Sequence, residues 1–127
     1  MTSLSLASRI TITLCFMAVL MLVSLIPGHH KPDDSGFFRL IATTPTPVQK
    51  ALHVCFYGVL ALLLVWTLDG IQSRTHRFLI TLIIAVAFGA VMEWCQTRVP
   101  GRFGTVHDVA LNTAGAALGL LVAFFLL

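Results

Sequence analysis

The sequence predicts an all-α membrane protein, in which four transmembrane helices form a bundle with a short polar hairpin between the third and fourth helices. Three observations point to this class: 57% of the 127 residues are hydrophobic, only 10% are charged, and the mean hydropathy is +0.94. A soluble domain has about 25% charged residues. The charges in this chain lie in short segments between long apolar runs, which is typical of membrane spans.

The first span is predicted at about residues 10–27, without removal of a signal peptide. Arg9 precedes 17 apolar or small residues, and Pro27–Gly28 closes the run. This run is longer than the apolar core of a typical signal peptide, and no small-residue cleavage site follows it. The polar loop 28–47 comes next, and its three prolines exclude a long helix there.

Local signals place the ends of the other three spans. Thr46 is suited to cap a helix and Pro47 to occupy its first position. Gly70 marks the end of the second span, and Pro100–Gly101 is a turn signal between the third and the fourth. We therefore expect one domain, 1–127, with spans at about 10–27, 48–68, 77–96 and 107–127.

Polar residues within the last three spans are predicted to meet at one membrane face. An even number of spans puts both termini on one side, so the second helix begins where the third ends and the fourth begins. Within each helix the polar residues recur at i, i+3 or i+4, and i+7, which confines them to a stripe about 60° wide. The predicted polar pocket comprises Lys50, His53, Tyr57, Glu93, Gln96, Arg102, Asp108 and Asn112.

Three glycines are predicted to serve helix packing. Gly115 and Gly119 form a GxxxG motif, which lets membrane helices approach closely. Gly89 lies on the stripe of Glu93 and is assigned the same role. The simplest alternative for the whole set of polar residues is also structural, since amide and hydroxyl groups can tie helices together. In that case the protein is a packing or assembly module, with a homo-oligomer as one outcome.

The combination of cations, acids and a histidine favours a functional site over a simple clamp. An ionised Asp or Glu at the centre of a span costs about 2.5–3.5 kcal/mol, so such residues are expected to be paired or to face a wet cavity. The leading interpretation is that Arg102 and Lys50 bind an anionic lipid headgroup while Glu93 and Asp108 hold these cations in place.

Two other chemistries remain open for the same residues. Glu93, His53 and Asp108 are candidate catalytic residues of a membrane-embedded hydrolase or transferase, with an acid as general base. The alternative of a metal site would use His53, His107, Glu93 and Asp108. No established catalytic or metal-binding motif supports either reading, so whether the protein is an enzyme stays undecided and we expect no metal or other cofactor.

The spacing of these residues resembles the VanZ-like family of small bacterial integral membrane proteins. The resemblance rests on two blocks from Lys50 onward: Lys50-x-x-His53-x-x-x-Tyr57, and Glu93-x-x-Gln96-x-x-x-Pro100-Gly101-Arg102 followed by Asp108-x-x-x-Asn112-x-x-Gly115-x-x-x-Gly119. It implies a multi-pass protein of the bacterial cell envelope and a link to resistance to the glycopeptide antibiotic teicoplanin. It brings no agreed molecular activity, so the expected partners are a membrane lipid, a lipid-linked precursor or a glycopeptide-type ligand.

Charge distribution addresses orientation and excludes one class of partner. The eight basic residues are scattered over several segments without a basic stripe, so we expect no nucleic-acid binding. A count of basic residues alone favours a cytoplasmic polar cluster. However, Lys50 and Arg102 belong to the predicted site, and a first span preceded only by Arg9 favours a cytoplasmic amino terminus. We expect the bacterial cytoplasmic membrane, cytoplasmic termini and an extracytoplasmic polar cluster.

Overall fold

A computed structural model describes residues 4–25, 36, 46–98 and 106–126. Over these residues the chain forms long helices and no strand. Each helix has the length and apolar composition to cross a membrane: 19 to 23 residues extend about 28–35 Å at 1.5 Å per residue. The predicted class, an all-α membrane bundle, is confirmed. The helices are α1 (Leu6–Ser24), α3 (Thr46–Thr67), α4 (Arg74–Gln96) and α5 (Val106–Leu126).

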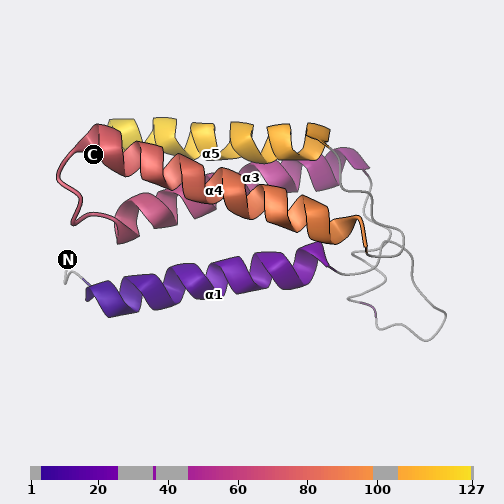
Figure 1. Ribbon diagram of the computed structural model, residues 1–127, viewed down its shortest axis with the longest axis horizontal. Helices are drawn as coiled ribbons and strands as arrows, with labels where there is room; N and C mark the ends of the chain where they lie inside the picture. The colour runs from indigo at the N-terminus through magenta and orange to yellow at the C-terminus, as the bar shows by residue number, and fades with distance from the viewer. Residues whose placement is uncertain (1–3, 26–35, 37–45, 99–105, 127) are drawn as a thin grey trace.

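The helices run alternately up and down, so the bundle has two distinct ends (Figure 1). The start of α1, the end of α5 and the turn 68–73 between α3 and α4 lie at one end, which we call the terminal end. α1 ends, α3 begins, α4 ends and α5 begins at the opposite end, the loop end. The predicted hairpin and most of the predicted polar loop, at residues 26–35, 37–45 and 99–105, lie outside the described residues.

The closest helix pair is α3 and α5, and glycine makes it possible. A Cβ atom built on Gly115 would collide with the carbonyl oxygen of Val54, and one on Gly119 with the carbonyl oxygen of Gly58. Both obstacles are backbone atoms, which cannot move aside as the end of a flexible side chain can. The GxxxG motif of α5 is therefore used inside the chain, against α3.

The apolar core lies between α3, α4 and α5 and contains many small side chains. Leu60, Ala61, Ala85 and Ala116 are completely buried there. Alanine at three of these positions keeps the helix axes close, as is typical of membrane bundles, where dense packing replaces hydrophobic burial as the driving force. α1 is peripheral: it packs on α3 and slightly on α4, and Leu20 is its only buried apolar side chain.

Two helices begin three or four residues earlier than the apolar runs predict. α1 begins at Leu6 rather than near residue 10, because Ser5 caps it by accepting a hydrogen bond of 3.2 Å from the backbone N–H of Ser8. It also ends at Ser24, before the predicted limit of 27. α4 begins at Arg74, three residues before the predicted 77, with Ser73 as its cap. In both helices a basic residue lies within the first turns, so the helix begins several residues before its apolar run does.

Candidate functional site

Three side chains from three helices meet at the loop end and form a buried polar cluster, defined as His53 of α3, Glu93 of α4 and Asn112 of α5. Nδ1 of His53 lies 2.8 Å from Oδ1 of Asn112. Nδ2 of Asn112 donates a longer hydrogen bond of 3.4 Å to Oε1 of Glu93. The same carboxylate oxygen lies 4.0 Å from Nδ1 of His53, so the two residues form an ion pair when the imidazole is protonated.

The three members of the cluster differ in exposure. Asn112 is 1% exposed, and the side chain of Glu93 is 5% exposed. The His53 side chain is 22% exposed, so it is the member that a ligand can reach. A carboxylate buried this deeply within a span is costly, and intramembrane ionisable groups of this kind commonly mark functional sites.

Gly89 makes room for the cluster on α4. A Cβ atom at this position would lie 3.1 Å from Nδ2 of Asn112 and 3.1 Å from Cε1 of Tyr57. The Tyr57 ring is buried, and its centroid lies 6.2 Å from the centroid of the Phe88 ring. The predicted helix-packing role of Gly89 therefore takes a specific form: the missing side chain admits a tyrosine ring and the central amide of the cluster.

The remaining predicted site residues are arranged differently. Lys50 is half-buried one turn from His53 toward the loop end, and its ammonium group forms no ion pair with any described residue. Asp108 is half-buried in the first turn of α5, where a negative charge favourably meets the helix dipole. Arg98, which does not belong to the predicted pocket, is exposed and lies over the Trp94 ring, 4.3 Å from its centroid. Arg102 lies outside the described residues.

Gln96 has a structural contact that its position in the stripe does not reveal. Its Nε2 donates a hydrogen bond of 2.9 Å to the carbonyl oxygen of Ser24, the last residue of α1. The last carbonyl groups of a helix have no hydrogen-bond partner within the helix, and the Gln96 side chain provides a partner for one of them. Gln96 thus joins α4 to the end of α1 at the loop end.

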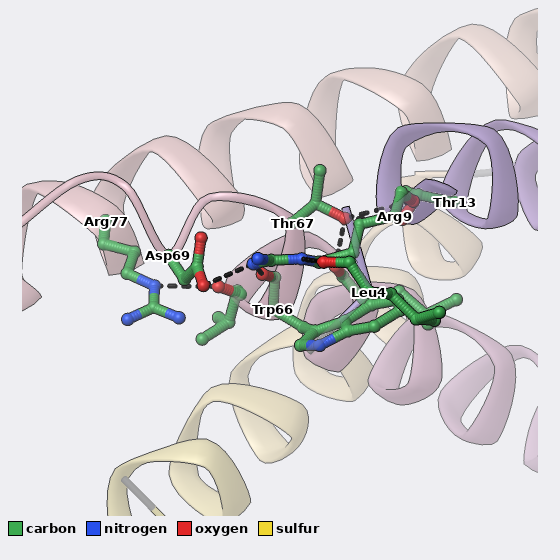
Figure 2. Close-up of polar contacts among 9 residues, drawn as sticks. Leu4, Arg9, Thr13, Trp66, Thr67, Asp69 and Arg77 are labelled. Atoms are coloured by element: carbon green, nitrogen blue, oxygen red, sulfur yellow. Dashed lines mark hydrogen bonds and ion pairs between the residues drawn. The ribbon is translucent and has the colours of Figure 1, made fainter. Parts of the chain in front are cut away.

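A second polar cluster, at the terminal end, joins α1 to α3 (Figure 2). Arg9 of α1 forms an ion pair with Asp69, which follows α3, and donates a hydrogen bond of 3.0 Å to the carbonyl oxygen of Trp66. Nε of Arg9 also donates to the carbonyl oxygen of Leu4, at 3.1 Å. We call Arg9, Asp69 and the hydroxyl pair described next the α1 latch.

The hydroxyl groups of Thr13 and Thr67 lie 2.7 Å apart and extend the α1 latch into the bundle (Figure 2). The Thr67 hydroxyl donates to the carbonyl oxygen of Leu63 at 2.8 Å, so Thr13 acts as the donor to Thr67. Both threonines are buried. Near them, Nε of Arg77 donates to the carbonyl oxygen of Val65 at 2.7 Å.

The electrostatics of the α1 latch are set by Arg9. Its hydrogen bond to the carboxylate lowers the pKa of Asp69 below the ordinary aspartate value, and the positive charge of Arg77 acts in the same direction. From the sequence alone, Arg9 is expected only to flank the first span. A signal was available, because an even number of spans already places Arg9 and Asp69, of opposite charge, at the same end.

The described residues contain no group of three or more His, Cys, Asp or Glu side chains arranged to hold a metal ion. His107 is exposed at the start of α5 and contributes to no such group. The alternative of a metal site built from His53, His107, Glu93 and Asp108 is therefore not supported by the geometry. What the cluster offers chemically is a neutral or protonated imidazole, a carboxylate and a bridging amide.

Four spanning helices with a polar cluster buried near one end define a multi-pass α-helical membrane protein. A family model described as VanZ/LLP1 matches residues 4–127. The chain belongs to the VanZ/LLP1 family, in agreement with the resemblance noted from its motifs. It matches no curated protein and no solved structure.

Proposed function

We propose that this protein binds the headgroup of an anionic envelope lipid, a lipid-linked precursor or a glycopeptide-type ligand at the loop end of the bundle. The observation that carries the proposal is the buried polar cluster, which begins at His53, one helical turn from Lys50 in the direction away from the loop end. Lys50 supplies a cation near the end of the span, and His53 is the partly exposed member of the cluster. A bound anionic group would be the counter-charge of the Lys50 ammonium.

The chemistry of the cluster supports binding over helix tethering alone. Interhelical hydrogen bonds in membranes average only about 0.6 kcal/mol, which neutral amides and hydroxyls can supply. The α1 latch shows that this chain ties helices with a threonine pair, with bonds to backbone carbonyls and with an ion pair whose carboxylate, on Asp69, is exposed. At the loop end the chain instead buries a carboxylate beside a histidine. Such a pair adds an ionisation cost that a simple tether does not need.

The proposal includes a cellular setting. We place the protein in the bacterial cytoplasmic membrane with cytoplasmic termini, which puts the loop end at the extracytoplasmic face, where envelope precursors and glycopeptides are accessible. The link to teicoplanin resistance belongs to the same proposal, with teicoplanin susceptibility of cells that express site variants as its cellular readout.

Native mass spectrometry of the protein released from nanodiscs that contain phosphatidylglycerol tests the binding. Lys50→Glu should reduce the retained phosphatidylglycerol about tenfold, which corresponds to ~1.4 kcal/mol. Arg98→Glu is the matched control, because it makes the same charge change at the same end of the bundle on a side chain that lies over Trp94. Equal retention by the wild type and both variants would contradict the proposal.

The chain of contacts from His53 through Asn112 to Glu93 also favours a second candidate function, which is acid–base catalysis on such a lipid. A histidine whose Nδ1 is engaged and whose ring is partly exposed is suited to exchange a proton through Nε2. Hydrolysis of a lipid phosphate or ester by the purified protein, abolished in a folded Glu93→Gln variant, would favour this alternative. Lipid retention without turnover would favour binding alone.

The third alternative, an assembly module, needs a surface other than the GxxxG motif. Gly115 and Gly119 face α3 of the same chain, so a homo-oligomer would have to use another helix face. Loss of an oligomer in a variant of a lipid-facing residue, with Lys50→Glu silent, would favour assembly as the function.

A further inference from the structure

We infer that Asn112 is a positioning residue that holds His53 in its Nδ1–H tautomer, so that Nε2 is left to accept a hydrogen bond from a hydroxyl group of the bound headgroup. The ligand half of this inference rests on the proposed function. The tautomer is a property of the protein alone and can be measured without any ligand. Asn112 was predicted to contact ligand directly, whereas at 1% exposure it acts through its neighbours.

The first step is the orientation of the Asn112 amide. An ionised carboxylate accepts hydrogen bonds and donates none, so an ionised Glu93 requires the NH₂ group of the amide to face it. The structure has this arrangement, with Nδ2 of Asn112 3.4 Å from Oε1 of Glu93. The other end of the amide, the acceptor oxygen Oδ1, is thereby directed to His53.

The second step fixes the proton on the imidazole. Oδ1 of Asn112 can only accept, so the 2.8 Å contact is a hydrogen bond only if Nδ1 of His53 carries the proton. A neutral imidazole carries one proton on its ring nitrogens, and the proton on Nδ1 leaves a lone pair on Nε2. In free histidine the Nε2–H tautomer predominates, so the cluster reverses the intrinsic preference of the side chain.

The unprotonated Nε2 of His53 limits which group can bind to it. Within the described part of the chain Nε2 has no hydrogen-bond partner, and the His53 side chain is partly exposed. A lone pair calls for a donor, and the Lys50 ammonium one turn away calls for an anion. A headgroup that carries a hydroxyl beside its anionic group, such as a glycerol phosphate or a sugar phosphate, satisfies both. A phosphodiester without a hydroxyl satisfies Lys50 only.

Nitrogen-15 NMR of histidine-labelled protein in micelles at alkaline pH, where a histidine side chain is neutral, tests the tautomer. The chain has five histidines, and the signals lost in His53→Phe identify those of His53. We expect a protonated, pyrrole-like Nδ1 and an unprotonated, pyridine-like Nε2 in the wild type. A wild-type spectrum with the proton on Nε2, or on both nitrogens, would overturn the inference without any variant being needed.

Two variants separate positioning from a general structural role. Asn112→Leu removes the acceptor and should shift the main population of His53 to the Nε2–H tautomer. Asn112→Asp retains an acceptor oxygen toward Nδ1 and should keep the Nδ1–H tautomer. An unchanged tautomer in a folded Asn112→Leu protein would contradict the role assigned to Asn112.

A matched pair of lipids tests the ligand class. Phosphatidylglycerol and phosphatidylmethanol carry the same charge, and only the former has headgroup hydroxyls. We expect the wild type to retain phosphatidylglycerol about tenfold better in native mass spectrometry, and Asn112→Leu to lose this preference. Equal retention of the two lipids would overturn the hydroxyl assignment. Retention of neither lipid, with the Nδ1–H tautomer present, would overturn lipid binding but support the role of Asn112.

Discussion

Arg9 in the second turn of α1 forms an ion pair with Asp69, sixty residues further along the chain and just beyond the end of α3. The pair lies at the terminal end, away from the buried polar cluster. α1 buries little apolar surface, so polar contacts such as this one contribute a large share of what docks it. Removing the Arg9–Asp69 ion pair should therefore lower the stability of the whole bundle by a measurable amount.

The first prediction concerns the pH dependence of the α1 latch. Asp69→Asn should lower the thermal unfolding midpoint at neutral pH, because the amide cannot form the ion pair. The folded-state pKa of Asp69 is lowered by Arg9, so the stabilisation is complete above the unfolded-state value, about 3.9. It should be lost only as the pH falls below that value and through the lowered one. Thermal unfolding of both proteins from pH 7 to pH 2 measures this.

A double-variant cycle supplies the control for that experiment. In an Arg9→Gln background, Asp69→Asn should have a clearly smaller effect, because the Arg9 hydrogen bond that lowers the pKa of Asp69 most is absent and only the weaker contributions of Arg77 and the Gly70 backbone remain. The same difference in unfolding midpoint with and without Arg9 would show that Asp69 stabilises the bundle by some other contact.

The second prediction concerns the close approach of α3 and α5. Gly115→Ala and Gly119→Ala should each destabilise the bundle by about 2 kcal/mol or more, since the added Cβ forces two backbones apart. Gly58→Ala should cost less, because its Cβ would lie 3.3 Å from the carbonyl oxygen of Gly115. Reversible unfolding in mixed SDS micelles gives the free energies.

Gly70→Ala is the matched control for the glycine series. Nothing lies within 4 Å of a Cβ atom at this position, so the change should stay within about 0.5 kcal/mol. A Gly115→Ala protein as stable as Gly70→Ala would show that α5 does not approach α3 closely.

The third prediction separates Gln96 from the ligand site. Gln96→Leu should destabilise the bundle by about 0.6 kcal/mol, the average for an interhelical hydrogen bond in a membrane protein, and leave phosphatidylglycerol retention unchanged. Hydrogen exchange should rise at the end of α1, in residues 20–25, because the Ser24 carbonyl loses its partner. Lipid retention that falls as far as in Lys50→Glu would instead place Gln96 at the ligand.

The fourth prediction tests the orientation. In a variant with Cys15, Cys55 and Cys95 replaced by serine, His107→Cys should react with a membrane-impermeant maleimide added to intact spheroplasts. His76→Cys, also exposed but at the terminal end, should react only after lysis. The reverse pattern would place the buried polar cluster at the cytoplasmic face.

Regular helix geometry makes part of the arrangement predictable from the sequence. Helical periodicity and an even span count suffice to bring His53, Glu93 and Asn112 to one end, because each helix fixes the face and depth of its own residues. The same reasoning fails for Gln96, whose partner is a backbone carbonyl and leaves no trace in residue identity. It also fails for the start of α1, because Arg9 interrupts the apolar run although the helix continues through it.

The glycine contact between α3 and α5 has a consequence for biogenesis. Helices leave the translocation channel in chain order, and this contact joins α3 to α5, which is made later than α4. This close pair of helices therefore cannot form until α5 has been released from the channel. Glu93 likewise enters the bilayer before Asn112 does, so the amide reaches the carboxylate only when α5 has been released.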